Sequence, residues 1–132
     1  MVKKYFVITG NIERIGDHAM NIGEYLHMIK KQNVVFSDNA KKEIAMMRDI
    51  TEKAINKVLH KEEDMASWLS EIAAFEQQID DMTRNYREHH LQRMREGRCN
   101  EEACIIYSEL LTDFERIGDH VLNIAQAYVR IS

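Results

Sequence analysis

Proline is absent from the 132-residue chain, and glycine is scarce, with only five residues. Folds made of many short strands depend on tight turns, in which glycine and proline are enriched. The composition therefore argues against an all-β fold. The chain also lacks any apolar run near the roughly 18 residues that a membrane-spanning helix needs. Residues 1–8 begin like a signal peptide, but Asn11 and Glu13 cut the apolar segment short, so we expect a soluble domain.

A basic surface for nucleic acid is missing as well. Lysine and arginine number 18 against 22 acidic residues, and they form no stripe, so we expect no nucleic-acid partner. Cys99 and Cys104 lack the partner pairs or histidine spacing of a zinc module. Two thiols favour a reducing cytoplasm and leave a single disulfide open. No nucleophile–base set or phosphate-binding loop is visible, so we predict that the chain is not an enzyme.

The most informative feature is an internal repeat. Residues 13–18 and residues 115–120 both have the sequence ERIGDH, 102 positions apart, and each copy is followed by an asparagine–isoleucine pair, at 21–22 and 123–124. Six consecutive identities in so short a chain are not a chance match, and internal repeats indicate repeated structural units. The repeat therefore predicts two equivalent helices.

Apolar periodicity predicts four long helices. We expect the first from near the start to about residue 31, the second at about 39–60, the third from about 65 to 95, and the fourth from about 101 onward. Short polar connections between long helices predict an all-α fold, an antiparallel bundle of four helices. The bundle-facing stripe of the first helix is expected at Ile8, Ile15, Ile22 and Ile29, with Ile12, Ala19 and Leu26 between them, and that of the fourth at Leu110, Ile117, Ile124 and Ile131.

Capping residues support these boundaries. Ser37 or Asp38 is expected to cap the second helix, because short oxygen-bearing side chains accept hydrogen bonds from the first backbone N–H groups of a helix. Asn100 is expected to cap the fourth helix, and Gly97 to end the third. The acidic residues at 62–64 suit the beginning of the third helix.

The repeated segments each carry a pair of acids one helical turn apart. At about 100° per residue, Glu13 and Asp17 share a strip that lies on the far side of the first helix from its isoleucines, and Glu115 and Asp119 do so on the fourth helix. Burial in the bundle therefore does not explain them. Like charges at this spacing repel by a few tenths of a kcal/mol. A cation held between the acids would explain why they recur.

The third helix offers a further acidic pair, Glu76 and Asp80, at the same spacing. Hard cations prefer carboxylate oxygens, so acidic helices that converge predict a metal site without thiolates. A solvated acidic face, or salt bridges to Arg14 and Arg116, is the alternative explanation.

Two other residue types recur in the repeat. Gly16 and Gly118 each cost roughly 0.5–1 kcal/mol of helix stability relative to alanine, which predicts close approach by a helix, a ligand or a metal cluster. His18 and His120 lie toward the flank of the apolar face, and we expect them to be hydrogen-bonded edge residues rather than metal ligands.

The ERIGDH segment followed by its asparagine–isoleucine pair resembles the PhoU family of phosphate-regulation proteins. That family is built from repeated three-helix units with signatures of the E/D-x-x-x-D type, and its members bind iron, zinc or similar divalent or trivalent metals through these acids. The resemblance therefore implies a metal site. The matching residues are Glu115, Asp119, Glu76, Asp80, Glu13 and Asp17.

The resemblance also implies an organisation and a function. Within a single domain at 1–132, residues 38–132 resemble one complete three-helix unit, and residues 1–32 resemble the last helix of a preceding unit. An incomplete unit predicts a homodimer. The implied function is regulation of phosphate transport or signalling in the cytoplasm, through the membrane domain of a phosphate transporter or a sensor kinase. PhoU-like units also form the cytosolic tails of bacterial sodium/phosphate cotransporter family proteins.

Two other functions compete with regulation by a metal-binding domain. One is a structural bundle that binds a partner and holds no metal. The other is a ferritin-like di-iron oxidase, which requires inward-facing Glu-x-x-His motifs on two helices. Glu24 and His27 have that spacing, but the matching positions on the fourth helix are Gln126 and Val129.

Overall fold

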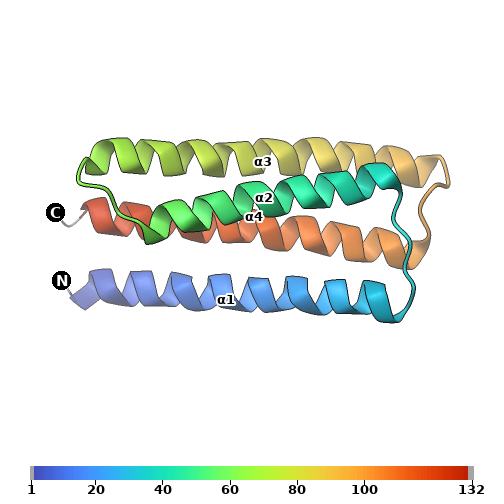
Figure 1. Cartoon of the computed structure of the whole chain (residues 1–132), viewed down its shortest axis with the longest axis horizontal. Coiled ribbons are helices and arrows are strands. Elements are labelled where there is room, and N and C mark those ends of the chain that lie inside the picture. The colour runs from blue at the N-terminus through green and yellow to red at the C-terminus, as the bar shows by residue number, and fades with distance from the viewer. Residues whose placement is uncertain (1, 131–132) are drawn as a thin grey trace.

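The computed structural model describes residues 2–130, which form four helices and no strand (Figure 1). Helices that follow one another in the chain are antiparallel and are joined by short connections, so the predicted all-α bundle is confirmed. Within these residues, no helix combines the length and apolar composition needed to cross a membrane. The helices are α1 (Val2–Lys31), α2 (Asp38–Leu59), α3 (Met65–Arg95) and α4 (Glu101–Arg130).

Side-chain caps set the helix boundaries near the predicted positions. The Ser37 hydroxyl accepts a hydrogen bond of 3.1 Å from the backbone N–H three residues later. Asp64 does the same for α3 at 3.1 Å, and Asn100 for α4 at 2.8 Å. Gly97 follows α3 with a φ of 67°, the left-handed conformation that glycine adopts without strain. The predicted caps at Ser37 and Asn100 and the predicted stop at Gly97 are therefore confirmed.

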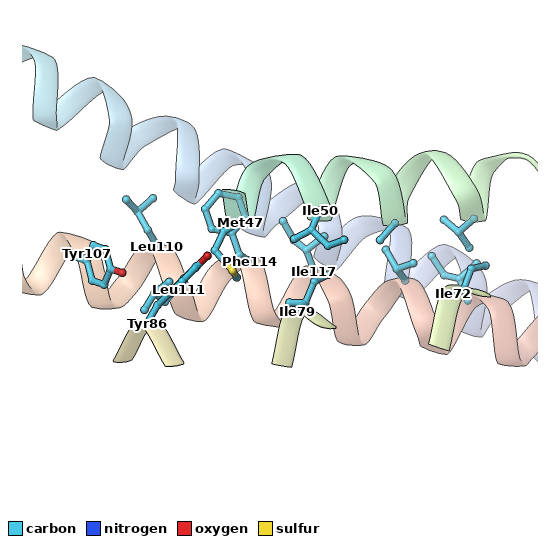
Figure 2. Close-up of a cluster of buried hydrophobic side chains, with 14 of the residues drawn as sticks. Met47, Ile50, Ile72, Ile79, Tyr86, Tyr107, Leu110, Leu111, Phe114 and Ile117 are labelled. Carbon is cyan, nitrogen blue, oxygen red and sulfur yellow. The ribbon is translucent and has the colours of Figure 1, made fainter. Parts of the chain in front are cut away.

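The hydrophobic core lies between α2, α3 and α4 (Figure 2). Trp68 is fully buried there, and its indole N–H donates a hydrogen bond of 2.8 Å to the carbonyl of Lys57 on α2. The predicted stripe of α4 is buried at Leu110, Ile117 and Ile124, whereas Ile131 lies outside the described residues. The largest fully buried side chains are Trp68, Tyr107, Met47, Ile72, Ile79, Leu110, Leu111, Val121 and Thr83.

Helix α1 packs against α4 and against no other helix of the described chain, so that α4 lies between α1 and the α2–α3 pair (Figure 1). Ile8 is buried in this contact, and the other isoleucines of the predicted stripe are half-buried. The prediction that Ile12, Ala19 and Leu26 also face the bundle is wrong. Ile12 is 54% exposed and Leu26 is 46% exposed, because no described helix covers that side of α1.

The α1–α4 contact is built by the repeat itself, in a reciprocal way. His18 Nδ1 lies 2.9 Å from an oxygen of Asp113, and His120 Nδ1 lies 2.8 Å from the amide oxygen of Asn11. Asp113 follows Asn11 by the same 102 positions that separate the two histidines. The two imidazole rings stack between them at 5.6 Å. The two antiparallel helices are therefore related by a local pseudo-two-fold axis that passes near the histidine pair.

Both acceptors in this contact are oxygens, so each histidine donates from Nδ1. The prediction that His18 and His120 are hydrogen-bonded edge residues is confirmed. The second asparagines of the repeat join the same contact: Asn21 donates to Asp113 at 3.5 Å and Asn123 donates to Asn11 at 3.3 Å.

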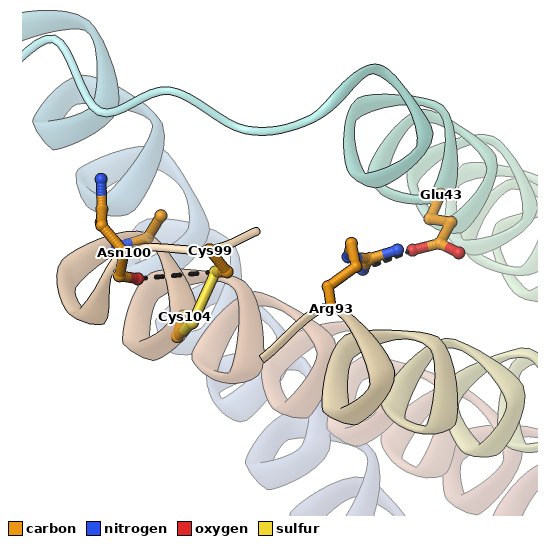
Figure 3. Close-up of a disulfide and its surroundings, with 6 residues drawn as sticks. Glu43, Arg93, Cys99, Asn100 and Cys104 are labelled. Carbon is orange, nitrogen blue, oxygen red and sulfur yellow. Dashed lines mark hydrogen bonds and ion pairs between the residues drawn. A yellow bond between two sulfur atoms is a disulfide. The ribbon is translucent and has the colours of Figure 1, made fainter. Parts of the chain in front are cut away.

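A disulfide links Cys99 in the α3–α4 connection to Cys104 in α4 (Figure 3). The disulfide was one of the two states that the sequence left open. It joins the connection to the first turn of α4, next to the Asn100 cap.

Candidate metal centre

Three of the predicted acids converge between α3 and α4. Glu76 and Asp80 lie one turn apart on α3, and Asp119 extends toward them from α4. One oxygen from each carboxylate lies within 4.8 Å of the other two. Among residues 2–130, this is the one group of three or more acidic, histidine or cysteine side chains close enough to share a metal ion. We call Glu76, Asp80 and Asp119 the acidic triad.

The close approach of the two helices depends on Gly118. A Cβ atom at this position would lie 3.1 Å from Cδ1 of the fully buried Ile79. Ile79 and Gly118 each precede one of the triad aspartates, so this contact fixes the distance between Asp80 and Asp119. The predicted close approach is therefore confirmed at Gly118. At Gly16 no helix of the described chain approaches, because nothing lies within 4 Å of the equivalent Cβ position, and approach by a ligand or a metal cluster stays a prediction.

The acidic triad is electrostatically strained when it is fully ionised. Partial burial, together with the hydrogen bond and the negative charge of Asp80, raises the pKa of Glu76 to about 8. Burial and the charge of Asp80 also raise the pKa of Asp119 and of Glu115. Carboxylates in this state keep a proton or take up a cation, because either one removes the repulsion.

Glu115 lies one turn before Asp119 and lines the same hollow, which has a volume of about 540 Å³. Two arginines also line the hollow. Arg84 pairs with Asp81 at 3.4 Å, and hydrogen bonds to Thr112 at 2.8 Å and to Ser108 at 3.3 Å hold the guanidinium of Arg87 against α4. In the described part of the chain, no salt bridge joins Arg14 or Arg116 to the predicted acids. The salt-bridge alternative therefore fails for the acidic triad.

The remaining predicted pair, Glu13 and Asp17, lies apart from the others. Both side chains are exposed on α1, and no third ligand of the described chain joins them. They are the repeat equivalents of Glu115 and Asp119, which face α3. The pair on α1 has no such neighbouring helix.

The donor set of the acidic triad fits a hard cation. It offers carboxylate oxygens alone, without thiolate or imidazole, a set that suits iron(III), manganese or magnesium better than a structural zinc ion. The ferritin-like alternative requires an inward-facing glutamate and histidine on α1, but Glu24 and His27 are both exposed.

Sequence reasoning missed one polar cluster, which is centred on Glu43. Its carboxylate is buried and accepts hydrogen bonds from Arg93 at 2.8 Å, His89 at 2.6 Å and Tyr107 at 2.5 Å (Figure 3 shows the arginine pair). Burial alone would raise the pKa of Glu43, but the hydrogen bonds from Arg93, Tyr107 and His89 outweigh it and hold the pKa below its usual value. The signal was the spacing of Glu43, which falls in line with Met47 and Ile50 on the apolar face of α2.

Comparison with known proteins agrees with this architecture. The family model described as "PhoU domain" matches residues 42–128. A curated relative, "Phosphate-specific transport system accessory protein PhoU homolog 1" of Thermotoga maritima, is 26% identical over 125 residues, which cover 93% of this chain and 53% of the relative. The chain therefore spans about half the length of that relative, and no solved structure matches it. Because the family model covers well over half of the chain, the chain belongs to the PhoU domain family.

Proposed function

We propose that this chain is a regulatory domain of phosphate transport that holds a metal ion in the acidic triad. Membership of the PhoU family supports the regulatory role, because the Thermotoga maritima relative is an accessory protein of a phosphate-specific transport system. The convergence of Glu76, Asp80 and Asp119 within 4.8 Å carries the metal proposal. The raised pKa of Glu76 adds support, since a bound cation relieves the repulsion.

Iron is the metal that we favour over zinc, because all three donors are carboxylates. Glu76, Asp80 and Asp119 would hold the ion, and Glu115, which lines the same hollow, would add a further oxygen. The ion would supply positive charge that draws α3 and α4 together at this level. Glu13 and Asp17 would bind metal only when acids from another helix face them.

The partner that we propose is the membrane domain of a phosphate transporter or a sensor kinase, contacted on the cytoplasmic side. A domain attached to a sodium/phosphate cotransporter would occupy the same place. Cytosolic reductants keep protein thiols reduced. In the cytoplasm we therefore expect the Cys99–Cys104 disulfide to be reduced, so that thiol labelling in intact cells, before lysis, modifies both cysteines; protection of both would contradict the cytoplasmic placement.

We further propose that the outward side of α1 pairs two copies of this chain. Tyr5 and Ile12 are 58% and 54% exposed, whereas their repeat equivalents on α4, Tyr107 and Phe114, are 1% and 4% exposed. The side of α1 that carries Tyr5 and Ile12 therefore corresponds to the side of α4 that is buried against other helices. A second α1 related by a two-fold axis presents the same apolar surface and would cover it.

Calorimetric titration of metal-free protein with iron tests the metal proposal. Wild type is expected to bind iron saturably, and the variant Glu76→Gln/Asp80→Asn/Asp119→Asn to lose at least ten-fold in affinity. The variant Glu52→Gln/Glu88→Gln/Glu102→Gln is the control, because it removes three exposed acids elsewhere. Equal affinity in all three proteins would contradict the site.

Uptake of labelled phosphate by cells tests the regulatory role. Cells that lack the protein are expected to lose control of uptake when external phosphate rises. Wild type should restore control, whereas the triad variant should not. Full restoration by the triad variant would show that regulation does not need the metal site. If deletion of the protein has no effect on uptake, the regulatory role itself is contradicted.

A further inference from the structure

A second hollow lies at the end of the bundle where the α1–α2 and α3–α4 connections meet (Figure 1). Its volume is about 490 Å³, and it opens between the beginning of α2 and the end of α3. We call it the end pocket. Its charged lining consists of Lys42 and Glu43 from α2, His89 and Arg93 from α3, and Arg98 from the α3–α4 connection.

The end pocket is positively charged, although the whole chain has a net charge of −4. Three cations line it against one carboxylate, that of Glu43. Glu43 is engaged by Arg93, His89 and Tyr107, which leaves little of its charge to repel an anion. Arg93 is offset by Glu43 in the same way, so the positive surplus that faces the pocket comes from Lys42 and Arg98.

The three cations differ in how firmly they are held. Arg93 is fixed, because its side chain is only 9% exposed, is bonded to Glu43 and lies over the ring of Tyr107 at 5.0 Å. Arg98 pairs with Glu96, but these side chains are 58% and 40% exposed, and such surface pairs contribute little. Lys42 has no ion-pair partner among residues 2–130. Arg98 and Lys42 are thus available to a ligand beside a preorganised arginine.

We propose that the end pocket binds a small molecule that carries a phosphate group. Several converging cations suit a dianion better than a single carboxylate, because charge-assisted hydrogen bonds to arginine and lysine are among the strongest. Met46 and Tyr86 form a less polar wall of the same pocket, against which the uncharged part of such a molecule packs. The volume lies within the roughly 300–1,000 Å³ range of small-molecule sites.

This site is separate from the acidic triad. It opens between α2 and α3 rather than between α3 and α4. On α3 the two sets of residues do not overlap, and their centres lie roughly 15–20 Å apart along the helix at 1.5 Å per residue. The inference therefore holds whether or not the triad binds a metal.

Titration of metal-free protein with inorganic phosphate, ribose 5-phosphate and ribose, followed by calorimetry and by amide NMR shifts, tests the proposal. Saturable binding is expected for both phosphate probes and none for ribose, with shifts at Lys42, Arg93 and Arg98. The variant Lys42→Gln/Arg98→Gln should weaken binding at least ten-fold. The control Lys41→Gln/Arg95→Gln removes two neighbouring charges that do not line the pocket and should change affinity less than two-fold.

The outcomes distinguish a specific binding site from nonspecific electrostatic attraction of anions. Equal weakening by both double variants would overturn the proposal, as would the absence of saturable binding at millimolar concentrations of both phosphate probes. Tighter binding of ribose 5-phosphate than of inorganic phosphate would support an organic ligand that packs against Met46 and Tyr86. Circular dichroism of each variant checks that it is folded, which is expected because all four substituted side chains are exposed.

Discussion

At the scale of single residues, the acidic triad lowers the free energy of unfolding of the metal-free protein. The ionised carboxylates of Glu76, Asp80 and Asp119 repel one another between α3 and α4. Apolar side chains at the same positions would not repel. Residues that lower stability in this way are concentrated at functional sites. The raised pKa of Glu76 makes the cost measurable.

Replacing Glu76 with glutamine is expected to stabilise metal-free protein at pH 8. The pKa of Glu76 is raised to about 8 in the folded state from 4.5, so the wild type loses stability as pH rises through this interval. The gain in the variant is about 1–2 kcal/mol after allowance for partial exposure. Chemical denaturation at pH 8 and pH 4 measures it, and the difference should vanish near pH 4, where the side chain is protonated in both states. A variant that is less stable at pH 8 would show that the acids do not repel.

The two repeat glycines provide a matched pair of substitutions. Alanine at Gly16 meets nothing within 4 Å and should stabilise the protein by about 0.5–1 kcal/mol through helix propensity. At Gly118 the new methyl group would lie 3.1 Å from the buried Ile79, so the variant should be less stable than Gly16→Ala by about 1–2 kcal/mol. Urea denaturation of both variants tests this difference. Equal stability would mean that α3 and α4 adjust freely beside the acidic triad.

At the scale of elements, helix α1 is held to the bundle by a polar contact. Burial, together with the positive charges of His18 and Arg14, lowers the pKa of His120. Folding therefore favours the neutral ring, and stability is lost as pH falls below about 6.5, where the unfolded chain takes up the proton. Acid is expected to weaken the docking of α1.

Replacing His120 with glutamine tests this dependence, because the amide keeps a donor for Asn11. Between pH 7.5 and 5.5, the variant should lose less stability than the wild type, because it lacks the group whose pKa folding lowers. Some loss should remain, because burial also lowers the pKa of His90. The acids with raised pKa values shift stability in the opposite direction. They are present in both proteins, but the pKa of Asp119 rises further without His120, so Asp119→Asn is added to both as a background that removes this difference. Identical pH profiles would rule out His120 as the source.

Helix boundaries could be predicted because their causes are local. Ser37, Asn100 and Gly97 act on backbone groups a few residues away. The outward position of Ile12 could not be predicted, because helical periodicity gives the width of an apolar face but not the number of helices that cover it. The Glu43 cluster was missed for a similar reason: Arg93 lies 50 positions away and Tyr107 lies 64 away.

The candidate metal site also combines features that local sequence predicts with features that depend on packing between helices. Spacing within one helix predicted the pairs Glu76–Asp80 and Glu115–Asp119. The structure brings Asp80, Glu115 and Asp119 to one hollow and places Glu76 close to Asp80 and Asp119. Spacing could not show that Glu13 and Asp17 face solvent, because their sequence is the same as that of the pair on α4. The difference comes from packing, since α3 lies beside α4 and not beside α1.

At the scale of the whole molecule, the proposed pairing through α1 predicts a dimer in solution. One chain has a mass of 15.5 kDa, and light scattering after size exclusion should give twice that mass. The variant Ile12→Glu/Leu26→Glu is expected to be monomeric, because it places charges in the apolar contact. Leu59→Glu/Leu91→Glu, at exposed positions on α2 and α3, which do not contact α1, is the control and should remain dimeric. A monomeric wild type would contradict the pairing.

The most direct test of the metal proposal is an anomalous difference map from crystals soaked in iron, collected at the iron absorption edge. A peak is expected between α3 and α4, in contact with the carboxylate oxygens of Glu76, Asp80 and Asp119. The same peak should disappear in the Glu76→Gln/Asp80→Asn/Asp119→Asn variant. Crystals saturated with iron that show no peak at the acidic triad, or show one only elsewhere, would contradict the proposal.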